Sequence, residues 1–503
     1  MQKHEEFSNR WGIILASLGM AIGAGNLWRF PRLAGQYGGS FIILWILFLF
    51  IWSIPLLLAE FSIGKKFKSG VIGSFGKLVG SKLTWMGFFI TVCTLGIAFY
   101  YSVVTAWSLE YLGISIGNLI NGLSGGVSLG ERLSNNPEYL QEQWALLSNQ
   151  NLLTIALYAL VVGLGVFVVS RGVKGGLEKA NKVLIPSLFV LLLIVAVAAL
   201  LMPDGVKGLE YMFTIDPKNL SNPTIWIEAL SQSAWSTGAG WGLMITISSY
   251  SRSKEDITLN TFIGAFGNNT ASILAGMAIL PAVFALASSE QAAIASLQSG
   301  SQALTFTIIP ELFATLPGGG FLAVVFFLAL TLAAFSSFLP MLELLKTNLV
   351  RTNLTQRGII VVMVLVFILF GFPSAYSLDY FSNQDWVWGL GLIVSGVFIA
   401  IATAVYGPNR FKTELMDIDS DFKVSGWYFS AAIYLNIVMG VGIIYWWMSQ
   451  GYSQNPWFDE NGAWNWWDVY SNATITTQWG TVLLLGILLN SLLYRQFVQK
   501  EKR

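Results

Sequence analysis

Long apolar stretches separated by shorter polar ones recur along almost the whole of this 503-residue chain. A helix needs about 20 apolar residues to cross the hydrocarbon core of a bilayer, and about twelve stretches meet that requirement. Only 11% of the residues are charged, against roughly 25% in soluble domains, which excludes a water-soluble fold. We therefore predict an all-α polytopic membrane protein in which residues 1–503 form a single transmembrane domain. The predicted helices lie near residues 10–37, 40–64, 83–114, 152–169, 180–202, 224–250, 257–287, 320–346, 357–372, 386–406, 427–448 and 478–498.

The distribution of lysine and arginine predicts the orientation of these helices, because cytoplasmic loops carry the excess of basic residues. If the N-terminus is cytoplasmic, all but five of the 28 basic residues fall on the cytoplasmic side. The exceptions are Arg29, Arg32, Arg132, Lys207 and Lys218. The helix number and the orientation thus support each other, and both termini are predicted to be cytoplasmic.

Composition also disfavours several classes of function. A net charge of +1 gives no general attraction to nucleic acid, and the single cysteine, Cys93, excludes an internal disulfide. The one histidine, His4, lies in the N-terminal tail, so the membrane interior offers no histidine for a metal or for catalysis. A channel would need rings of polar pore-lining residues, which the sequence does not show. We therefore do not expect an enzyme, and a channel is a weaker hypothesis than a transporter.

Two glycine-rich interruptions fall in the middle of predicted helices, at residues 19–26 and 236–242. A single cluster of this kind would be explained equally well by close helix packing through small residues. These two clusters, however, lie in the first helix of each of two five-helix blocks, residues 10–202 and 224–406. Because each block has an odd number of helices, the second enters the membrane from the opposite side. The pattern predicts a five-plus-five inverted repeat with two broken helices, followed by two additional helices in residues 427–498.

Backbone that is unwound in mid-membrane is tolerated where it lines a cavity. Its free N–H groups can hold a carboxylate, and its free carbonyl oxygens can hold a cation. Glu60, an acid within the second predicted helix, is expected to accept hydrogen bonds from the second interruption. The two interruptions therefore predict a central site for a small zwitterionic solute and a cation.

Four groups of residues give the chain a family resemblance. The first is Gly23-Ala24-Gly25 followed directly by Asn26-Leu27-Trp28-Arg29-Phe30-Pro31, and the others are Tyr100-Tyr101, Asn268 and Ser336-Ser337. Together they resemble the neurotransmitter:sodium symporter family, and in particular its bacterial leucine-transporter-like amino acid transporters. The resemblance implies the leucine transporter fold and a sodium-coupled secondary active symporter that imports amino acids by alternating access. A sodium symporter from another family of the same fold, with a different substrate, is the main alternative.

The resemblance also implies two sodium ions bound by oxygen atoms, the ligands that hard cations prefer. Site one would use Ala21, Asn26, Ser236 and Asn268, together with a carboxylate oxygen of the substrate. Site two would use Gly19, Ile22, Ala333, Ser336 and Ser337. For the two serines and for Asn268, routine hydrogen bonding between helices is the alternative interpretation.

The substrate site implied by the resemblance combines the two interruptions with side chains from neighbouring helices. Gly23 is uncharged, whereas monoamine members of the family carry an aspartate there, so an amino acid is favoured over an amine. Two tryptophans occupy positions where phenylalanine is common, which predicts a small or medium-sized apolar substrate. The expected contacts are Ala21, Gly23, Ala24, Gly25, Ile97, Tyr101, Trp235, Ser236, Gly238, Trp241, Ser337 and Met341.

Charged residues near both ends of this site are expected to act as gates. Arg29 would pair with an aspartate of the tenth helix, either Asp379 or, as we favour, Asp385, over a lid formed by Tyr101 and Trp241. At the inner end, family members pair an N-terminal arginine with an aspartate. This chain offers a charge-swapped pair of Glu5 with Arg351, or else solvated tail charges that include His4 and Glu6.

A chloride ion is possible beside the first sodium site. The sixth and seventh predicted helices carry no acid from 229 to 254 or from 257 to 289, so a buried sodium pair would lack compensating charge. Neutral donors for chloride would be Gln232, Ser236, Asn268 and Ser272. Against this, Trp45 stands where a chloride-ligating tyrosine is expected. The resemblance also implies the plasma membrane, here a prokaryotic inner membrane, and leaves monomer and homodimer equally open.

Overall fold

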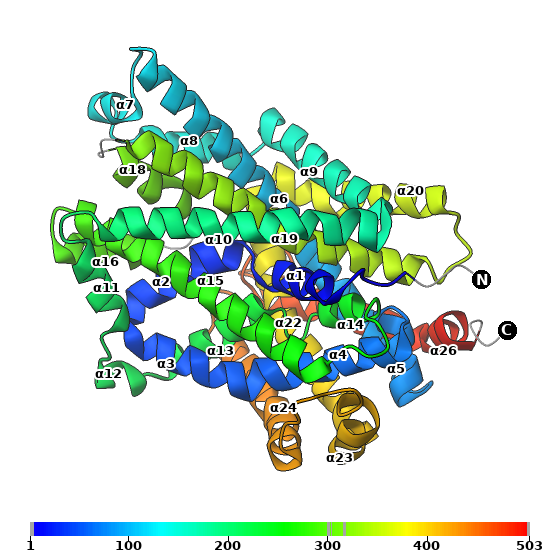
Figure 1. Cartoon of the computed structure of the whole chain (residues 1–503). Helices are drawn as coiled ribbons and strands as arrows, with labels where there is room; N and C mark the ends of the chain where they lie inside the picture. Colours follow the sequence, from blue (N-terminus) through cyan, green and yellow to red (C-terminus); the bar gives the residue numbers. More distant parts are fainter. Residues whose placement is uncertain (1–4, 299–301, 303, 315–317, 500–503) are drawn as a thin grey trace.

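The computed structural model describes residues 5–298, 302, 304–314 and 318–499, and these residues are folded almost entirely into helices (Figure 1). In that part of the chain, the recorded β pairing is one isolated bridge between Phe458 and Trp464. Among the described residues, nine helices are long and apolar enough to cross a membrane, and two bent helix pairs raise the number to 11. A third pair, broken over residues 238–242, occupies the sixth predicted span. The all-α polytopic fold is confirmed.

The twelve predicted spans correspond to helices or to runs of consecutive helical segments. They are α1 (Arg10–Ala21) with α2 (Ala24–Tyr37); α3 (Gly39–Phe48), η1 (Leu49–Ser53) and α4 (Ile54–Phe67); α6 (Thr84–Leu123); α9 (Leu152–Ser170); η2 (Val173–Glu178) with α10 (Lys179–Leu200); α13 (Pro223–Thr237) with α14 (Leu243–Ser248); α15 (Ile257–Leu286); α19 (Gly319–Leu349); α20 (Gln356–Val366), η4 (Phe367–Gly371) and α21 (Phe372–Tyr376); α22 (Leu378–Tyr406); α24 (Gly426–Ser449); and α25 (Asn472–Leu488), α26 (Asn490–Tyr494) and η6 (Arg495–Gln499).

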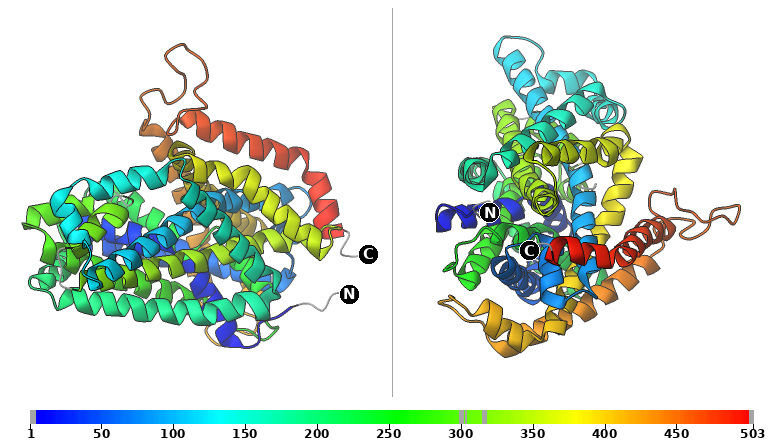
Figure 2. Two further views of the ribbon diagram at one scale, coloured as in Figure 1. Left: turned by 90° about the horizontal axis from the view of Figure 1, so that it is seen from above. Right: turned by 90° about the vertical axis from the view of Figure 1, so that its right-hand side faces the viewer.

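The connections between these helices are themselves largely helical. The short elements are α5 (Val71–Val79), α7 (Leu129–Asn135), α8 (Tyr139–Ser148), α11 (Gly205–Phe213), α12 (Pro217–Leu220), α16 (Glu290–Gln298), η3 (Leu304–Ile308), α18 (Ile309–Ala314), α23 (Pro408–Phe411) and η5 (Lys412–Met416). Helices α7, α8, α11, α12, α16 and α18 gather at one end of the molecule, on the left of Figure 1, and we call it the cap end. Both termini lie at the opposite end, which we call the terminal end (Figures 1 and 2).

Four helix boundaries differ by at least six residues from the prediction. The fifth span begins at Val173 instead of 180, and α22 begins at Leu378 instead of 386, since the Ser377 side chain caps it by accepting from the Tyr380 N–H. Helix α6 continues to Leu123, well beyond residue 114, because it packs along α19 into the cap end. The last span begins at Asn472 rather than near residue 478, since the Ser471 side chain caps the helix by accepting from the Thr474 N–H. Its first turn is rich in threonine and asparagine, so hydropathy alone did not reveal it.

Both predicted helix breaks are present. Helices α1 and α2 meet at an angle of 52° with Ile22 and Gly23 between them. Between α13 and α14, Gly238, Gly240 and Gly242 have φ angles of 71°, 95° and 72°, a region that residues with a Cβ rarely adopt. The sequence of this break therefore specifies its conformation.

Glu60 lies directly behind the second break and is fully buried. Its Oε1 accepts a hydrogen bond from the Gly240 N–H at 2.6 Å, which confirms the predicted acceptor role. The assignment of residues 10–202 and 224–406 to two inverted repeats, with 427–498 outside them, stays a prediction.

Candidate functional site

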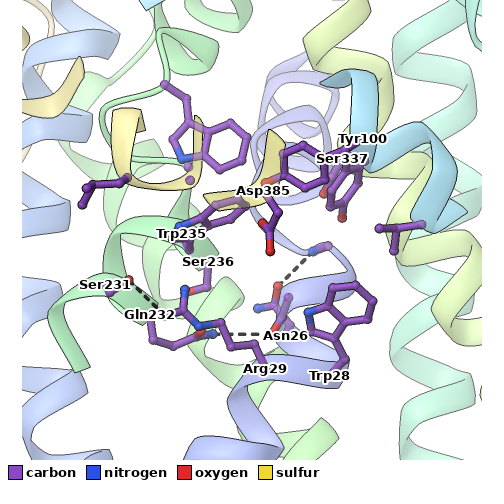
Figure 3. A pocket seen from close by; sticks show the side chains of 18 of the residues that line it. Asn26, Trp28, Arg29, Tyr100, Ser231, Gln232, Trp235, Ser236, Ser337 and Asp385 are labelled. Carbon is purple, nitrogen blue, oxygen red and sulfur yellow. Dashed lines mark hydrogen bonds between the residues drawn. The ribbon is translucent and has the colours of Figure 1, made fainter. Parts of the chain in front are cut away.

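Both helix breaks border one cavity of about 370 Å³. Its wall includes Gly23 and Gly25 from the first break and Ser236 and Gly238 from the second. Figure 3 shows Ser236 and Asn26 on this wall. From there the cavity extends toward the cap end, where Trp447 at the end of α24 forms part of the wall. The unwound backbone thus lines a cavity, as mid-membrane backbone without helical hydrogen bonds must.

The five residues expected at sodium site two converge where α19 crosses the end of α1. The Ser337 hydroxyl lies 3.0 Å from the carbonyl oxygens of both Gly19 and Ile22. The Ser336 hydroxyl lies 3.3 Å from the Ile22 oxygen and 2.9 Å from the Ala333 oxygen. Both serines are buried. Two hydroxyls and three carbonyls form an all-oxygen cluster, which fits a hard monovalent cation.

The residues expected at sodium site one also meet. The terminal amide of Asn268 has one atom 2.8 Å from the Ser236 carbonyl oxygen and 3.2 Å from the Ala21 carbonyl oxygen. A nitrogen in that place donates to both carbonyls, whereas an oxygen there completes a cluster of oxygens suited to a cation. Asn26 is adjacent, with its Oδ1 accepting from the Gly23 N–H at 2.9 Å. The same four residues can therefore hold a sodium ion when the Asn268 amide oxygen faces the two carbonyls.

Most of the expected substrate contacts line the cavity. Two do not: Ile97 is buried outside the lining, and the Ala24 N–H is already bonded to the Tyr101 hydroxyl at 2.8 Å. A Cβ on Gly23 would lie 2.5 Å from that hydroxyl, so the position has no room for a side chain. Lining residues among those expected are Ala21, Gly23, Gly25, Tyr101, Trp235, Ser236, Gly238, Trp241, Ser337 and Met341.

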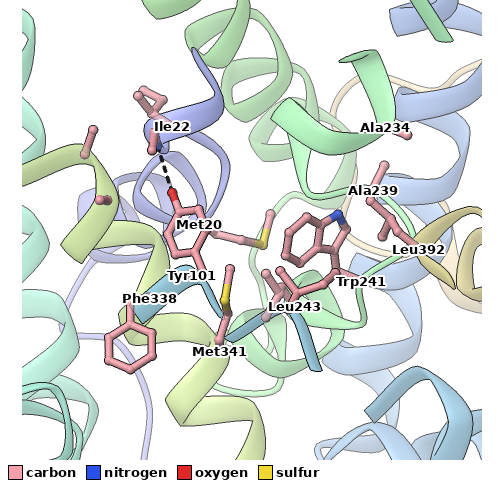
Figure 4. Packing of buried hydrophobic residues seen from close by; sticks show 14 of the residues in the cluster. Met20, Ile22, Tyr101, Ala234, Ala239, Trp241, Leu243, Phe338, Met341 and Leu392 are labelled. Atoms are coloured by element: carbon pink, nitrogen blue, oxygen red, sulfur yellow. Dashed lines mark hydrogen bonds between the residues drawn. The ribbon is translucent and has the colours of Figure 1, made fainter. Parts of the chain in front are cut away.

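The deep part of the cavity is apolar. The rings of Trp235 and Trp241 pack edge to face with centroids 5.2 Å apart. Met20 and Met341 also line the wall, and Figure 4 shows their side chains beside Tyr101 and Trp241. Sequence reasoning missed Met20, although its place within the first interruption was a signal that could have identified it.

Arg29 has a partner that sequence reasoning did not foresee. Its Nη2 lies 3.1 Å from Glu228 Oε2 and 3.0 Å from the Ser231 hydroxyl. Asp385 borders the same cavity and points into it (Figure 3), whereas Asp379 does not contribute to the lining. Within the described residues, no ion pair between Arg29 and Asp385 is recorded. An acid within the sixth predicted membrane helix, near its start, was the signal that could have identified Glu228.

At the terminal end, each of the two expected gate residues contacts the backbone of another segment, and their pairing with each other stays a prediction. Glu5 Oε2 accepts from the Val173 N–H at 2.7 Å, and Arg351 Nη2 donates to the Lys68 carbonyl at 2.5 Å. Glu6 pairs with Lys68 at 2.8 Å. His4 lies outside the described residues.

A buried polar cluster lies next to these contacts. The Tyr250 hydroxyl donates to Glu343 Oε1 at 2.6 Å, and Lys346 Nζ lies 3.1 Å from the same oxygen. Phe7 is buried against the Tyr250 ring, and its N–H donates to the Tyr250 carbonyl. The N-terminal segment is therefore packed against this end of the bundle, while the cavity extends toward the cap end.

The four candidate chloride ligands lie around Asn26. Its Nδ2 donates to the Ser272 hydroxyl at 2.7 Å, and Asn268 Nδ2 lies 3.2 Å from the Ser236 hydroxyl. Gln232 Nε2 lies 3.5 Å from the Gly25 carbonyl oxygen, and its own side-chain oxygen is buried with no partner in the part of the chain that the structure describes. The group is neutral and close to the first set of sodium ligands.

Comparisons with known proteins identify the family of the chain. The profile of the Sodium:neurotransmitter symporter family matches residues 4–122 and 146–493. An uncharacterized sodium-dependent transporter of Methanocaldococcus jannaschii is 30% identical over 452 residues, covering 85% of this chain and 87% of the relative. The sodium-dependent serotonin transporter of Drosophila melanogaster is 28% identical, covering 82% of this chain and 72% of the relative. The crystal structure of MhsT in complex with L-phenylalanine matches with a TM-score of 0.75 and 26% identity, covering 88% of this chain and 99% of MhsT. The chain belongs to the sodium:neurotransmitter symporter family and is a sodium-dependent membrane symporter, not an enzyme.

Proposed function

We propose that this symporter imports an amino acid with a small or medium-sized apolar side chain, together with two sodium ions, across the plasma membrane of a prokaryotic cell. The observation that carries the proposal is the convergence of two broken helices and two sets of sodium-type oxygen ligands on one cavity. Because ions and solute would share unwound backbone, binding of one favours binding of the other.

The cavity chemistry supports a zwitterion. The substrate carboxylate would meet the amide groups around Gly25 and the Tyr101 hydroxyl, while its ammonium would meet free carbonyls such as that of Ala21. An amine without a carboxylate would leave these N–H groups unpaired, since Gly23 has no room for a compensating acid. The L-phenylalanine complex of MhsT also favours an amino acid, whereas the serotonin transporter among the relatives keeps an amine as the second candidate.

The deep wall supports a substrate of limited size. Trp235 and Trp241 fill one side with their rings in contact, and Met20 and Met341 close the other. A Cβ at Gly238 would lie 3.2 Å from the Met20 side chain, so little space remains there. Alanine, valine, leucine and methionine fit this description better than tryptophan does.

Two sodium ions would make accumulation strongly favourable. Each ion moving down a tenfold gradient contributes about 1.4 kcal/mol, and each charge crossing 100 mV contributes about 2.3 kcal/mol. Together they total roughly 7 kcal/mol, which corresponds to about a 10⁵-fold accumulation of a zwitterion. Transport is therefore expected to be electrogenic.

The orientation and the anion complete the proposal. Both termini lie at the same end of the molecule (Figure 2), and the sequence assigns all but five of the 28 basic residues to the side of the termini, so we assign this end to the cytoplasm. In the structure the cavity would then extend toward the outside. We also propose that chloride binds near Ser272 and stimulates transport, since neutral side chains alone would stabilise a buried cation pair poorly.

Uptake into proteoliposomes tests the function directly. The purified protein should accumulate labelled alanine or leucine when sodium is outside, and a negative internal potential should increase uptake. Unlabelled amino acids and serotonin should be compared as competitors. Equal uptake in potassium and sodium media would contradict coupling to sodium. If serotonin competed better than every amino acid, the substrate would be an amine and not an amino acid.

A further inference from the structure

Residues 450–471, between α24 and α25, form a loop that stands out from the side of the helical body (Figure 2). We call it the aromatic loop, because exposed rings cover it. Trp467 is the most exposed of them, at 74%. A patch of rings left in water is costly and marks a contact surface. The exposed aromatic residues are Tyr452, Trp457, Phe458, Trp464, Trp466, Trp467 and Tyr470.

The loop has a defined internal structure that holds its rings outward. Phe458 and Trp464 form a β-bridge with ring centroids 5.6 Å apart. Asp459 Oδ1 accepts from the Ala463 N–H at 2.8 Å and closes the turn between them. Asp468 accepts from the Ser453 hydroxyl at 2.7 Å and joins the two ends of the loop. Because two of its acids are used internally, the loop is built to present rings rather than to bind a cation.

The exposed side chains of α24 indicate the depth of the loop relative to the membrane. This helix exposes Trp427 (80%) near its start and Tyr445 (77%) near its end, and between them it exposes the apolar residues Val438 and Val441 and a less exposed tyrosine, Tyr434. Eighteen residues separate Trp427 from Tyr445, about 27 Å along a helix, which is close to the hydrocarbon thickness of about 30 Å. Tryptophan and tyrosine favour the two membrane–water interfaces. Tyr445 therefore marks the interface at the cap end, and the aromatic loop begins at the next turn.

We propose that the aromatic loop lies in the lipid headgroup layer of the cap-end leaflet and anchors the protein there. Its rings combine apolar faces with N–H and hydroxyl groups, which suits this layer, and residues 450–471 contain no lysine or arginine. The base of the loop reaches the central cavity through Trp386, which follows Asp385 in sequence. The Trp386 ring lies with its centroid 4.9 Å from that of Tyr452 and 5.6 Å from that of Tyr470. The anchor thus fixes the position of one wall of the cavity relative to the bilayer.

Spin labelling in lipid nanodiscs tests this placement. Cys93 is the only cysteine, so a Cys93→Ala background allows one label at a time. Labels would be placed at Trp467→Cys and, as an independent second probe, at Trp466→Cys. Val438→Cys provides the matched control for hydrocarbon, and Asn135→Cys, exposed at the cap end, provides the control for water. Power saturation with oxygen and with a water-soluble nickel chelate then reports the depth of each label.

Both loop labels should give depths between the two controls, with oxygen accessibility clearly above that at residue 135. Nickel accessibility equal to that at residue 135 for both labels would overturn the proposal, because the loop would then extend into water. A second result would also overturn the proposal: both reagents fail to reach the labels, but reach them once each nanodisc holds a single copy of the protein. The loop would then contact a second copy of the chain. Neither outcome depends on which solute is transported.

Discussion

Arg29 on α2 forms an ion pair with Glu228 on α13, with 3.1 Å between Nη2 and Oε2, while Asp385 borders the same cavity without joining the pair. Each side chain of the pair is about one-fifth exposed, so water still reaches it. The arrangement suggests that Arg29 exchanges partners during transport. It would bind Glu228 while the cavity is open to the cap end and Asp385 once that end closes.

We therefore expect Glu228→Gln to favour closure at the cap end. A partly exposed ion pair contributes up to about 1 kcal/mol, so the open population should fall by up to about fivefold. Ser382 lines the cavity, so a Ser382→Cys variant in the Cys93→Ala background carries one cysteine there. A thiol reagent should label this cysteine more slowly when the open population falls. Asp379→Asn, which removes an acid outside the lining, is the matched control. An unchanged labelling rate in Glu228→Gln would rule out the exchange of partners.

Ser337→Ala should weaken sodium activation. Its hydroxyl faces the carbonyl oxygens of Gly19 and Ile22 at 3.0 Å, so its loss removes one ligand and leaves those oxygens short of a partner. The sodium concentration for half-maximal uptake should rise about tenfold, equivalent to about 1.4 kcal/mol. Ser336→Thr keeps a hydroxyl and should change this half-maximal sodium concentration little. A normal sodium response in Ser337→Ala would show that the cluster is only structural.

Trp241→Phe should widen the substrate range. The indole N–H has no hydrogen-bond partner among the described residues, so phenylalanine loses no hydrogen bond and mainly enlarges the deep part of the cavity. Phenylalanine and tryptophan should then compete better against labelled alanine than they do in the unmodified protein. The measurement is inhibition of alanine uptake, with Trp427→Phe, on the outer face of α24, as the control. An unaltered order of competitors would contradict the assigned side-chain pocket.

Ser272→Glu should make transport independent of chloride. Asn26 Nδ2, 2.7 Å from the serine hydroxyl, offers a donor to the new carboxylate, and the negative charge would replace the anion. Uptake would be compared in sodium chloride and sodium gluconate, with Ser272→Gln as the uncharged control. Unmodified protein that transports equally in both media would remove the chloride proposal.

Glu178→Gln should loosen the N-terminal segment. The buried carboxylate of Glu178 accepts from the Ser8 N–H at 2.9 Å and from Lys182 Nζ at 2.6 Å. A hydrogen bond to a charged group contributes about 1.5–3 kcal/mol, so amide exchange in residues 5–12 should become about tenfold faster or more. Mass spectrometry of that peptide measures it, and Glu414→Gln, an exposed acid, is the control. Equal exchange rates would show that Glu178 does not hold the segment.

Hydropathy and glycine placement determined much of the fold. Twelve apolar stretches indicated membrane helices, because runs of about 20 continuous apolar residues have the length of a spanning helix, which satisfies its own backbone within lipid, and are too long for spanning strands. Gly238, Gly240 and Gly242 specified a break, since their positive φ angles exclude most other residues. The run from Gly23 to Pro31 was long enough to indicate the family before any geometry was known.

Tertiary structure alone decided how distant residues meet. Gly19 and Ser337 lie 318 positions apart in sequence, yet their oxygens are 3.0 Å apart because α19 crosses the end of α1. The partner of Arg29 could not be read from the chain, since Glu228, Asp379 and Asp385 carry the same charge and only packing brings one of them within reach. The aromatic loop is a second example. The sequence shows that residues 450–471 are rich in aromatic residues, but not whether their rings are buried. The fold keeps them outside the core, because hydrogen bonds within the loop close its turns.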